Sequence, residues 1–336
     1  MAELIPIESV LDLQLHVHVI GYHPEGECIL IIIYDAYSNS VKKSILIDCY
    51  DKGKDQRQVR KLLKEKGISL ENPSNLIIWT HPDSDHSEGI RDIIANYTNE
   101  DTIVVIPDGI NKWTLLLKGQ LLNYNYLLDR FKAKRIKLDR INTSNNRDGI
   151  QPYLSCVFDD SGRDPISFYI EVLTPFTNDV FEETELKKIF KKNNVSISAI
   201  LHFGDLHLYF GGDVEDNAIN QVPIYKFKDI SFIKIPHHGS NTSTALPQRI
   251  LTYLEEDEEC GQGQITSVST SCYRGKNSLP KIEVLELYKP ISKKICLTDS
   301  EETRVNLYGI WTYEYEIIKN KMIDKKEGDA MVWYEG

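Results

Sequence analysis

The sequence has no apolar run long enough to cross a membrane. The longest such run, Cys28 to Tyr34, is far shorter than the ~18 apolar residues that a membrane-spanning helix needs, and it reads as a buried strand. The first residues, Met1 to Ile5, contain no basic stretch followed by an apolar one, so nothing there indicates export. We therefore expect a cytoplasmic protein without a membrane partner.

Cysteine is scarce, with six residues in 336, and no two of them are in a Cys-x-x-Cys arrangement. This scarcity excludes a disulfide scaffold and argues against a zinc finger. Hydrophobic residues at 41% and charged residues at 26% are ordinary for a globular protein, so the chain is not a disordered one. We expect the cysteines to be reduced thiols: Cys28, Cys49, Cys156, Cys260, Cys272 and Cys296.

Basic residues are in the minority, with 39 Lys and Arg against 50 Asp and Glu and a formal net charge of −11. Neutralisation of phosphates supplies most of the non-specific affinity for nucleic acids, so this balance disfavours a broad nucleic-acid surface. A local basic groove remains compatible with it. The basic residues between Lys132 and Arg140 are one candidate, although a charged helix face is usually just solvated.

Strand-like runs alternate with helical stretches along the chain, and this alternation predicts an α/β fold. We expect two mixed β-sheets with helices outside them, in a single domain that covers residues 1–336. The stretch 112–141 is rich in Leu, Tyr, Lys and Arg and predicts a long helix, so a helical insertion is expected at about 110–145. Strands are expected at 15–22, 28–35, 43–48, 75–79, 102–106, 153–158, 165–173, 196–203, 207–210, 231–235, 264–271 and 294–297, and further helices at 55–66, 89–97, 178–192, 246–254 and 280–288.

The strongest local signal is His81-Pro82-Asp83-Ser84-Asp85-His86, which follows the apolar run 75–79 after the single residue Thr80. Two imidazoles and two carboxylates in six residues bring together donors that divalent metals prefer. A polar turn in which Asp85 caps the next helix is the simpler alternative. Taken alone, the motif favours the metal site.

Two further strand ends carry ligand-type side chains. Gly211-Gly212-Asp213 ends one apolar strand, and Pro236-His237-His238-Gly239-Ser240 follows another. Each alone has a structural explanation, because Gly-Asp turns and paired histidines are common. Because three separate strand ends all carry such side chains, together they indicate a single site.

These residue types suit a centre of two divalent metal ions. Such ions lie ~3.5–4 Å apart and share a carboxylate and a hydroxide, which can attack phosphorus or an acyl carbon. His81 and Asp83 would bind one ion, Asp85 and His86 the other, and Asp213 would bridge them. His238, or less favourably His237, completes the set. We therefore assign the catalytic roles to Asp85, His86 and Asp213.

The three motifs together resemble the metallo-β-lactamase superfamily, in particular the branch of ComEC-type hydrolase domains and phosphorylcholine esterases. The resemblance runs from about Leu15 to Leu297 and includes Gly26-Glu27-Cys28 and Leu46-Ile47-Asp48, which are similar to the family's Gly-Asp-Ser and Leu-Ile-Asp. It implies an αββα sandwich, a dinuclear metal site that holds zinc or manganese, and a hydrolytic reaction, with phosphodiesters as the leading substrate class.

The sequence also departs from the pattern of this family. Asp83 replaces the second histidine of the usual His-x-His, a harder ligand that favours manganese. Thr174 stands where another histidine ligand is usual, and the Gly-His-Pro of the branch is missing from the loop 271–278. Within that loop Arg274 and Lys276 are candidates for contacting a phosphate, as is Ser240 from the third motif.

The sequence thus predicts a metal-dependent phosphodiesterase or nuclease that acts on nucleic acid or nucleotides. An acidic chain that cleaves nucleic acid would need a protein partner, such as an ATPase, to supply a basic surface. Two alternatives stay open. One is a small-molecule phosphodiesterase or an acyl hydrolase for lactones or thioesters, and the other is a non-catalytic assembly subunit whose metal site has decayed.

Overall fold

The structure, a computed structural model, describes residues 2–51, 57–111, 114–115, 118–143, 153–186, 191–256, 264–274, 277–299, 305–319 and 321–336. Within these ranges, one sheet has eight strands in the order β18-β17-β2-β3-β4-β5-β6-β7. In that order the strands are Lys321–Gly328, Tyr308–Glu316, Leu13–Tyr22, Glu27–Asp35, Ser40–Ile47, Leu76–Ile78, Ile103–Pro107 and Lys137–Ile141. Strands β4 to β7 are parallel, and the rest are antiparallel.

The second sheet has nine strands within the same ranges, in the order β1-β8-β9-β10-β11-β12-β13-β16-β19. These are Glu3–Pro6, Tyr153–Asp159, Ile166–Val172, Ala199–Phe203, Leu206–Phe210, Ile230–Lys234, Ile265–Ser269, Ser292–Leu297 and Met331–Glu335. This sheet is also mixed, with β11, β12, β13 and β16 running parallel. A separate small hairpin consists of β14 (Cys272–Arg274) and β15 (Asn277–Leu279).

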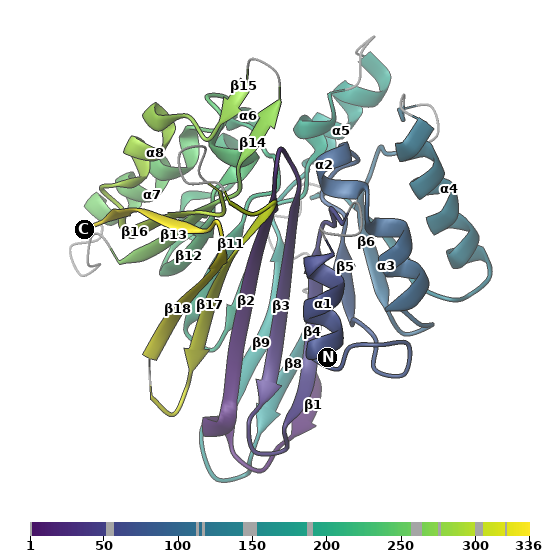
Figure 1. Cartoon of the computed structure of the whole chain (residues 1–336), viewed down its shortest axis with the longest axis vertical. Coiled ribbons are helices and arrows are strands. Elements are labelled where there is room, and N and C mark those ends of the chain that lie inside the picture. Colours follow the sequence, from purple (N-terminus) through teal and green to yellow (C-terminus); the bar gives the residue numbers. More distant parts are fainter. Residues whose placement is uncertain are drawn as a thin grey trace.

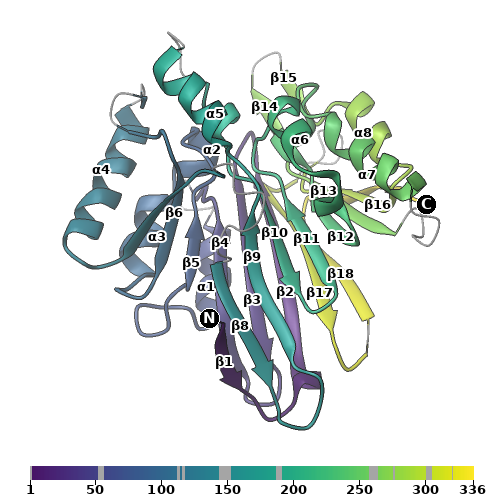
Figure 2. The same ribbon diagram turned by 180° about the vertical axis from the view of Figure 1, so that it is seen from behind.

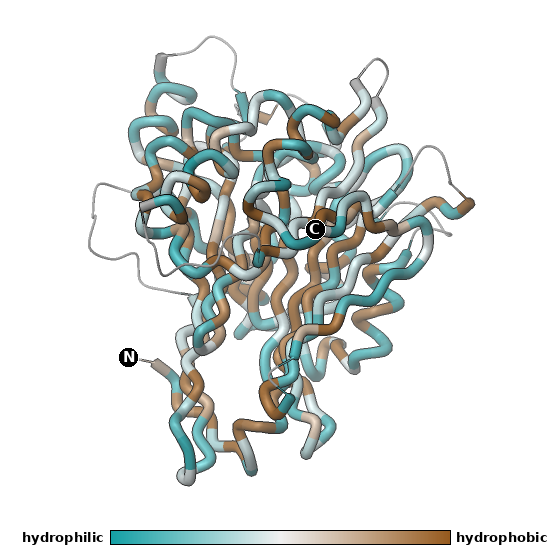
Figure 3. Tube along the Cα trace, turned by 90° about the vertical axis from the view of Figure 1, so that its left-hand side faces the viewer, coloured by the Kyte–Doolittle hydropathy of each residue, from teal (hydrophilic) through white to brown (hydrophobic). Residues whose placement is uncertain are grey.

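The two sheets pack face to face because their inner faces are apolar, and helices cover the apolar parts of their outer faces. Along β2, Leu15 and Val17 lie in the core between the sheets, whereas Ile20 on the opposite face lies in a core beneath helices. Strand β3 alternates in the same way, with Ile31 inside and Ile32 outside. The central strands are therefore the most hydrophobic part of the molecule (Figure 3).

Helices cover the outer face of each sheet (Figures 1 and 2). The eight-stranded sheet is covered by α1 (Gln58–Glu65), α3 (Ile90–Asn96) and α4 (Lys118–Lys132). The nine-stranded sheet is covered by α6 (Asp216–Gln221), α7 (Ala245–Glu256) and α8 (Ile282–Tyr288). The layers are thus helices, sheet, sheet and helices, which confirms the expected αββα sandwich.

The expectation of one long helix over 112–141 is only partly right. Helix α4 covers Lys118–Lys132, but Lys137–Ile141 is the strand β7, which pairs in parallel with β6 at the edge of the sheet. The charged side chains of this edge strand masked its strand character, because they interrupt the apolar alternation that marks a buried strand. The expected helix 178–192 is likewise shorter: α5 spans Thr177–Phe181, a π-helical segment follows at Glu182–Leu186, and a 3-10 turn spans Lys192–Val195.

The ligand-type motifs meet at one edge of the sandwich because of strand direction. Strands β4 and β5 run parallel in one sheet, and β11, β12 and β13 run parallel in the other. Their carboxyl ends lie at the upper edge in Figure 1, next to α2 (Ser84–Ser87). Carboxyl ends of parallel strands are the usual place for ligands in α/β sheets.

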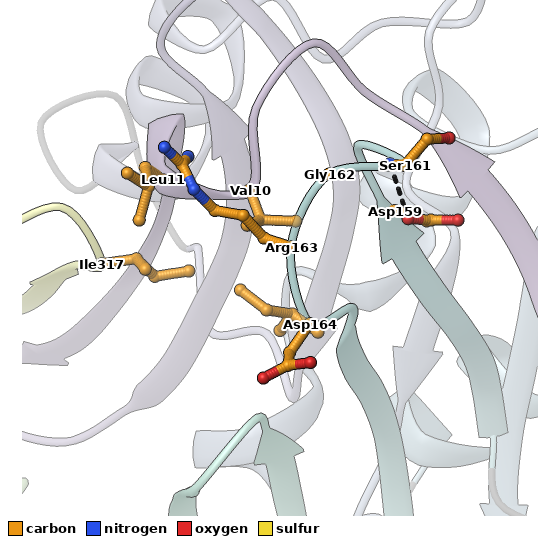
Figure 4. A pocket seen from close by; sticks show the side chains of 9 residues that line it. Val10, Leu11, Asp159, Ser161, Gly162, Arg163, Asp164 and Ile317 are labelled. Atoms are coloured by element: carbon orange, nitrogen blue, oxygen red, sulfur yellow. Dashed lines mark hydrogen bonds between the residues drawn. The ribbon is translucent and has the colours of Figure 1, made fainter.

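A hollow of about 850 Å³ lies at the opposite end of the sandwich (Figure 4). Val10, Leu11 and the connection from β8 to β9 line it, and Ser161 there donates its backbone N–H to Asp159 over 2.8 Å. Arg163 donates to Ser9 over 3.1 Å. Among the described residues, the lining of this hollow contains no residue of the three ligand-type motifs.

Two histidines of β2 are buried on the face that looks toward α1. His16 and His18 are 7% and 5% exposed, and His18 Nδ1 lies 2.9 Å from Thr312 Oγ1 of β17. His16 Nε2 lies 3.1 Å from Gln14 Oε1, while Lys66 Nζ lies 3.3 Å from the His16 Nδ1. Both rings are thus packed into the fold, and burial lowers the pKa values of both imidazoles.

The cysteines that the structure describes are free and buried: Cys28, Cys49, Cys156, Cys272 and Cys296. Cys260 lies outside the described residues. In the part of the chain that is described, none of the helices combines the length and the apolar character that crossing a membrane requires.

Candidate metal centre

The three motifs are tied to one another by backbone hydrogen bonds. The His237 N–H donates to the carbonyl of Gly212 over 2.9 Å, which links the turn after β12 to the turn after β11. The Ile197 N–H donates to the carbonyl of Thr80 over 3.0 Å, which links the turn after β5 to the second sheet. The relative positions of the motifs are therefore set by the main chain.

Unusual backbone conformations set the directions of the side chains in the second and third motifs. Gly212 has φ +51°, and a Cβ there would lie 2.6 Å from the carbonyl oxygen of Ile197, so only glycine fits directly before Asp213. His237 and His238 have φ values of 46° and 51°, a left-handed conformation that non-glycine residues rarely adopt. Such strain is concentrated at functional sites, where the rest of the fold holds it in place.

Four side chains from the three motifs converge on one point. His86 Nε2 lies 3.3 Å from His238 Nε2 and 3.3 Å from Asp213 Oδ1. His238 Nε2 lies 3.4 Å from Asp85 Oδ2 and 3.7 Å from Asp213 Oδ1, and His86 Nε2 lies 3.8 Å from Asp85 Oδ2. Donors about 2.1 Å from a tetrahedral zinc ion are separated by about 3.4 Å, so these spacings fit one divalent cation.

The second oxygen of Asp213 faces a different histidine. Asp213 Oδ2 lies 3.5 Å from His81 Nε2, which is itself 3.7 Å from Asp83 Oδ2. The carboxylate of Asp213 thus stands between His81 on one side and the pair His86 and His238 on the other. This is the position that a bridging ligand between two cations requires.

Asp83 has other partners as well. Lys192, in the turn before β10, forms an ion pair with its carboxylate, and Gln120 Nε2 of α4 lies 3.5 Å from Asp83 Oδ1. The side chain of Asp83 is 28% exposed, whereas that of Asp85 is 8% exposed. Asp83 is therefore at the rim of the centre, and its carboxylate is shared between His81 and the cation of Lys192.

The charges of the buried groups favour binding of a cation. Burial alone would raise the pKa of Asp85, but the hydrogen bond with His238 and the charge of His86 outweigh it and lower that pKa to about 2. Burial alone would lower the pKa of His86, but the carboxylates of Asp213 and Asp48 raise it well above its ordinary value. Positive charge is thus favoured at the His86 Nε2, which faces Asp213.

Burial, together with the neighbouring His86, holds the pKa of His81 well below its ordinary value. A neutral imidazole is the form that binds metals. The His81 Nε2 and the Asp213 Oδ1 are both buried and have no hydrogen-bond partner among the described residues. Atoms of this kind need a partner, so the donor set fits a bound divalent cation.

Asp48, at the end of β4, sets the tautomers of two histidines. It accepts the Thr80 N–H over 2.7 Å and the Thr80 O–H over 2.6 Å, and its Oδ2 lies 2.7 Å from His86 Nδ1. Because the Thr80 hydroxyl donates to Asp48, it accepts from His81 Nδ1–H, 3.0 Å away. In their neutral forms His81 and His86 therefore both carry the proton on Nδ1 and direct the Nε2 lone pair at Asp213.

The remaining predicted site residues lie farther from the convergence point. His237 Nε2 is 3.8 Å from Asp213 Oδ2, but its Nδ1 lies 3.0 Å from Thr242 Oγ1 and its side chain is 19% exposed, so the geometry favours His238 as the ligand. Ser240 Oγ lies 3.2 Å from Thr242 Oγ1. Lys276 and the side chain of Arg274 lie outside the described residues.

Sequence reasoning missed several residues of the centre. Lys192 and Gln120 come from distant segments without any motif, so no local signal marks them. Cys272 was assigned only to the general class of reduced thiols, but its Sγ and ligand atoms of Asp85 and His238 lie within 4.8 Å of one another. Thr174, where the resemblance places a histidine, is fully buried and donates its hydroxyl to the Ser196 carbonyl over 2.8 Å.

No family model matches the chain, and no curated protein matches it by sequence. Among solved structures, it is similar to Zn²⁺-bound PqqB from Methylobacterium extorquens, with 10% sequence identity and a TM-score of 0.32. The alignment covers 65% of this chain and 71% of the PqqB chain. At this identity and TM-score the similarity assigns no chemistry to the centre, which therefore follows from the residues of this chain alone.

Asp48 offers a test of the centre that leaves every proposed ligand in place. The substitution Asp48→Asn is expected to weaken zinc binding by about 10- to 100-fold, because partners that orient ligating histidines contribute this much. Competition with a chromophoric chelator measures the affinity. Asp35→Asn is the matched control: Asp35 is also a buried carboxylate of a strand end, 2% exposed, but it binds Ser38 and Lys42. Equal affinities of the two variants would refute the role of Asp48.

Proposed function

We propose that the protein is a metal-dependent hydrolase of phosphodiester bonds, with nucleic acid or nucleotides as substrate. The observation that carries this proposal is the position of Asp213, whose two oxygens face separate imidazole groups at 3.3 Å and 3.5 Å. Asp85, His86, His238 and Asp213 would hold one cation, and His81, Asp83 and Asp213 a second one. When bound, divalent cations, zinc or manganese, would supply Lewis acidity and activate water for attack.

The chain's own groups support an anionic substrate. Lys192 is the cation beside Asp83 at the rim of the centre, where it can contact a phosphate when the substrate enters. A cavity of about 470 Å³ lies beside α2, and its lining includes Ser84, Gln120, Asn123 and Arg91 together with the acidic Glu88 and Asp92. These side chains offer hydrogen bonds to a polar substrate, and a guanidinium such as that of Arg91 pairs well with phosphate.

The net charge of −11 favours a second candidate, a hydrolase for small molecules. A cavity of this volume accommodates a small phosphodiester, a lactone or a thioester. For a nucleic-acid substrate, a protein partner with a basic surface would be needed. Binding of DNA by the isolated chain that is tight and weakens steeply with salt would argue against such a partner.

A substrate panel separates these candidates. The purified protein, loaded with zinc or with manganese, is expected to cleave bis(p-nitrophenyl) phosphate and at least one of single-stranded DNA, RNA or a dinucleotide. Asp85→Ala is expected to abolish this cleavage because Asp85 belongs to the set of four converging side chains. Asp101→Ala is the control, since Asp101 is 82% exposed and pairs only with Lys137 among the described residues.

Each outcome of the panel has a definite meaning. Cleavage of lactones or thioesters with phosphodiesters left intact would favour the acyl hydrolase. A chain that holds well under one ion after mild purification, and that cleaves nothing when metal is added, would instead fit an assembly subunit with a decayed site. Cleavage that survives Asp85→Ala would contradict the proposed centre.

A further inference from the structure

We propose that Lys234, Glu27 and Thr270 form a positioning relay that fixes the tautomer and direction of His238, on which the proposed metal centre relies. The relay residues come from both sheets. Glu27 begins β3 in the eight-stranded sheet, whereas Lys234 ends β12 and Thr270 directly follows β13 in the nine-stranded sheet. The relay therefore also connects the two layers at the edge where the centre lies.

All members of the relay are buried. Glu27, Lys234 and Thr270 are each 0% exposed, and His238 is 1% exposed. Lys234 Nζ forms an ion pair with Glu27 Oε2. Thr270 Oγ1 lies 2.5 Å from the same Glu27 oxygen and 2.8 Å from His238 Nδ1. The contacts thus run without interruption from the ammonium group to the imidazole.

The direction of each hydrogen bond follows from the number of protons available. A carboxylate can only accept, so the single proton of the Thr270 hydroxyl is donated to Glu27. The Thr270 oxygen can then only accept from His238, so His238 carries its proton on Nδ1. The lone pair of His238 is consequently on Nε2, the atom that lies 3.4 Å from Asp85 and 3.7 Å from Asp213.

Lys234 explains how a charged Glu27 is tolerated in this position. An ionised carboxylate taken out of water needs a partner of opposite charge, and Lys234 supplies it from the strand that also leads to His238. Asp48 fixes the tautomer of His86 through direct contact with its Nδ1, and it fixes that of His81 through the Thr80 hydroxyl. Two buried carboxylates therefore set the tautomers of three histidines, each directing Nε2 to Asp213.

A direct role of Glu27 as a ligand is the competing explanation, because ligand atoms of Glu27, His86 and His238 lie within 4.8 Å of one another. The Glu27 Oε2 contacts Lys234 and Thr270, and Thr270 stands in hydrogen-bond contact with both Glu27 and His238. Removal of the Thr270 hydroxyl separates the two explanations, since it breaks the relay and leaves the Glu27 carboxylate in place.

The test compares Thr270→Val with Thr270→Ser in the full chain. Thr270→Val keeps the shape but removes the hydroxyl, and it is expected to weaken zinc binding by about 10- to 100-fold. Thr270→Ser keeps the hydroxyl and is expected to stay within about threefold of the wild-type affinity. Unchanged zinc affinity in Thr270→Val would overturn the relay and favour Glu27 as a ligand.

A second readout needs no metal and keeps a failure of the relay distinct from a failure of the proposed function. Long-range ¹⁵N–¹H spectra of metal-free, ¹⁵N-histidine-labelled protein report the tautomer of His238, whose signals are assigned from the His238→Gln spectrum. The wild type and Thr270→Ser are expected to show Nδ1–H, and Thr270→Val a mixture of tautomers. Wild-type protein with His238 protonated on Nε2 alone would overturn the relay, whether or not the chain binds zinc or hydrolyses any substrate.

The ion pair between Lys234 and Glu27 is tested through thermal stability and zinc affinity. Lys234→Met leaves the carboxylate buried without its cation and is expected to lower the temperature of unfolding. The double variant Glu27→Gln/Lys234→Met removes both charges and leaves an amide oxygen that can accept from Thr270. We expect it to recover at least half of the lost thermal stability and to bind zinc within about tenfold of the wild type. A double variant as unstable as Lys234→Met would contradict the pairing.

Discussion

The substitution Asp213→Asn is expected to reduce kcat/KM for the best phosphodiester substrate by at least about 10³-fold and to remove bound metal. Partners that only orient a ligand contribute about 10- to 100-fold to affinity or activity, so loss of a shared ligand has a larger effect. Asparagine keeps the shape of the side chain but lacks the negative charge. Three imidazoles, those of His81, His86 and His238, would then face a neutral group at the centre.

Metal content and activity should both be measured for this variant. Glu215→Gln is the matched control: it removes one negative charge two residues away, at a half-buried side chain 3.7 Å from His237 Nδ1. We expect this control to retain metal and most of the activity, and far-ultraviolet circular dichroism establishes that both variants fold. If Asp213→Asn kept its metal and its activity, Asp213 would not be the shared ligand.

Acid is expected to destabilise the fold through the buried pair His16 and His18. Burial, with the nearby cation of Lys66, lowers the pKa of His16 to about 4 and that of His18 to about 3. The unfolded chain takes up these protons near the ordinary value of ~6.5. The contribution of the two neutral histidines to the free energy of unfolding is therefore fully present well above pH 6.5. It is lost as the pH falls through 6.5, and the loss levels off only near the folded-state pKa values.

The expected loss is large for a domain of ordinary stability. Each histidine contributes a slope of about 1.4 kcal/mol per pH unit in this window, so the pair removes about 4 kcal/mol between pH 7.5 and pH 5. Typical domains have 5–15 kcal/mol in total. The carboxylates of Glu314 and Glu316 oppose this loss, and Lys325 adds to it.

Urea unfolding at pH 7.5 and pH 5 measures this effect in the wild type and in His16→Gln/His18→Gln. We expect the double variant to lose much less stability than the wild type over this interval. His207→Gln is the control, because His207 lies half-buried on the other sheet, 3.2 Å from the Lys228 carbonyl. An equal loss in the wild type and the double variant would show that other groups cause the acid sensitivity.

The sequence predicted the elements that have a strong local pattern. Strand β3 is apolar on both faces, β2 is apolar on its inner face, and the dense motif from His81 to His86 marks a ligand cluster whatever its surroundings. Strand β7 was missed because its charged side chains lie at a sheet edge. Local pattern cannot show that the preceding helix returns the chain to that edge.

Contacts between distant segments could not be predicted from the residues alone. Glu27 and Thr270 are 243 positions apart, and Lys192 and Asp83 are 109 positions apart. Such pairs form because strands of two different sheets end at one edge, which depends on the whole topology. The assignment of ligands followed from motif chemistry, whereas the tautomers and the partners of Asp83 required the three-dimensional arrangement.

Anomalous diffraction from crystals of the zinc-loaded protein tests the central claim most directly. We predict a peak at the zinc edge with the Asp213 carboxylate and the Nε2 atoms of His86 and His238 at about 2.0–2.2 Å. Full occupancy of both cation positions would add a second peak beside His81. A map whose zinc peaks all lie more than about 4 Å from the Asp213 carboxylate, or which contains no peak at all, would contradict the proposed centre.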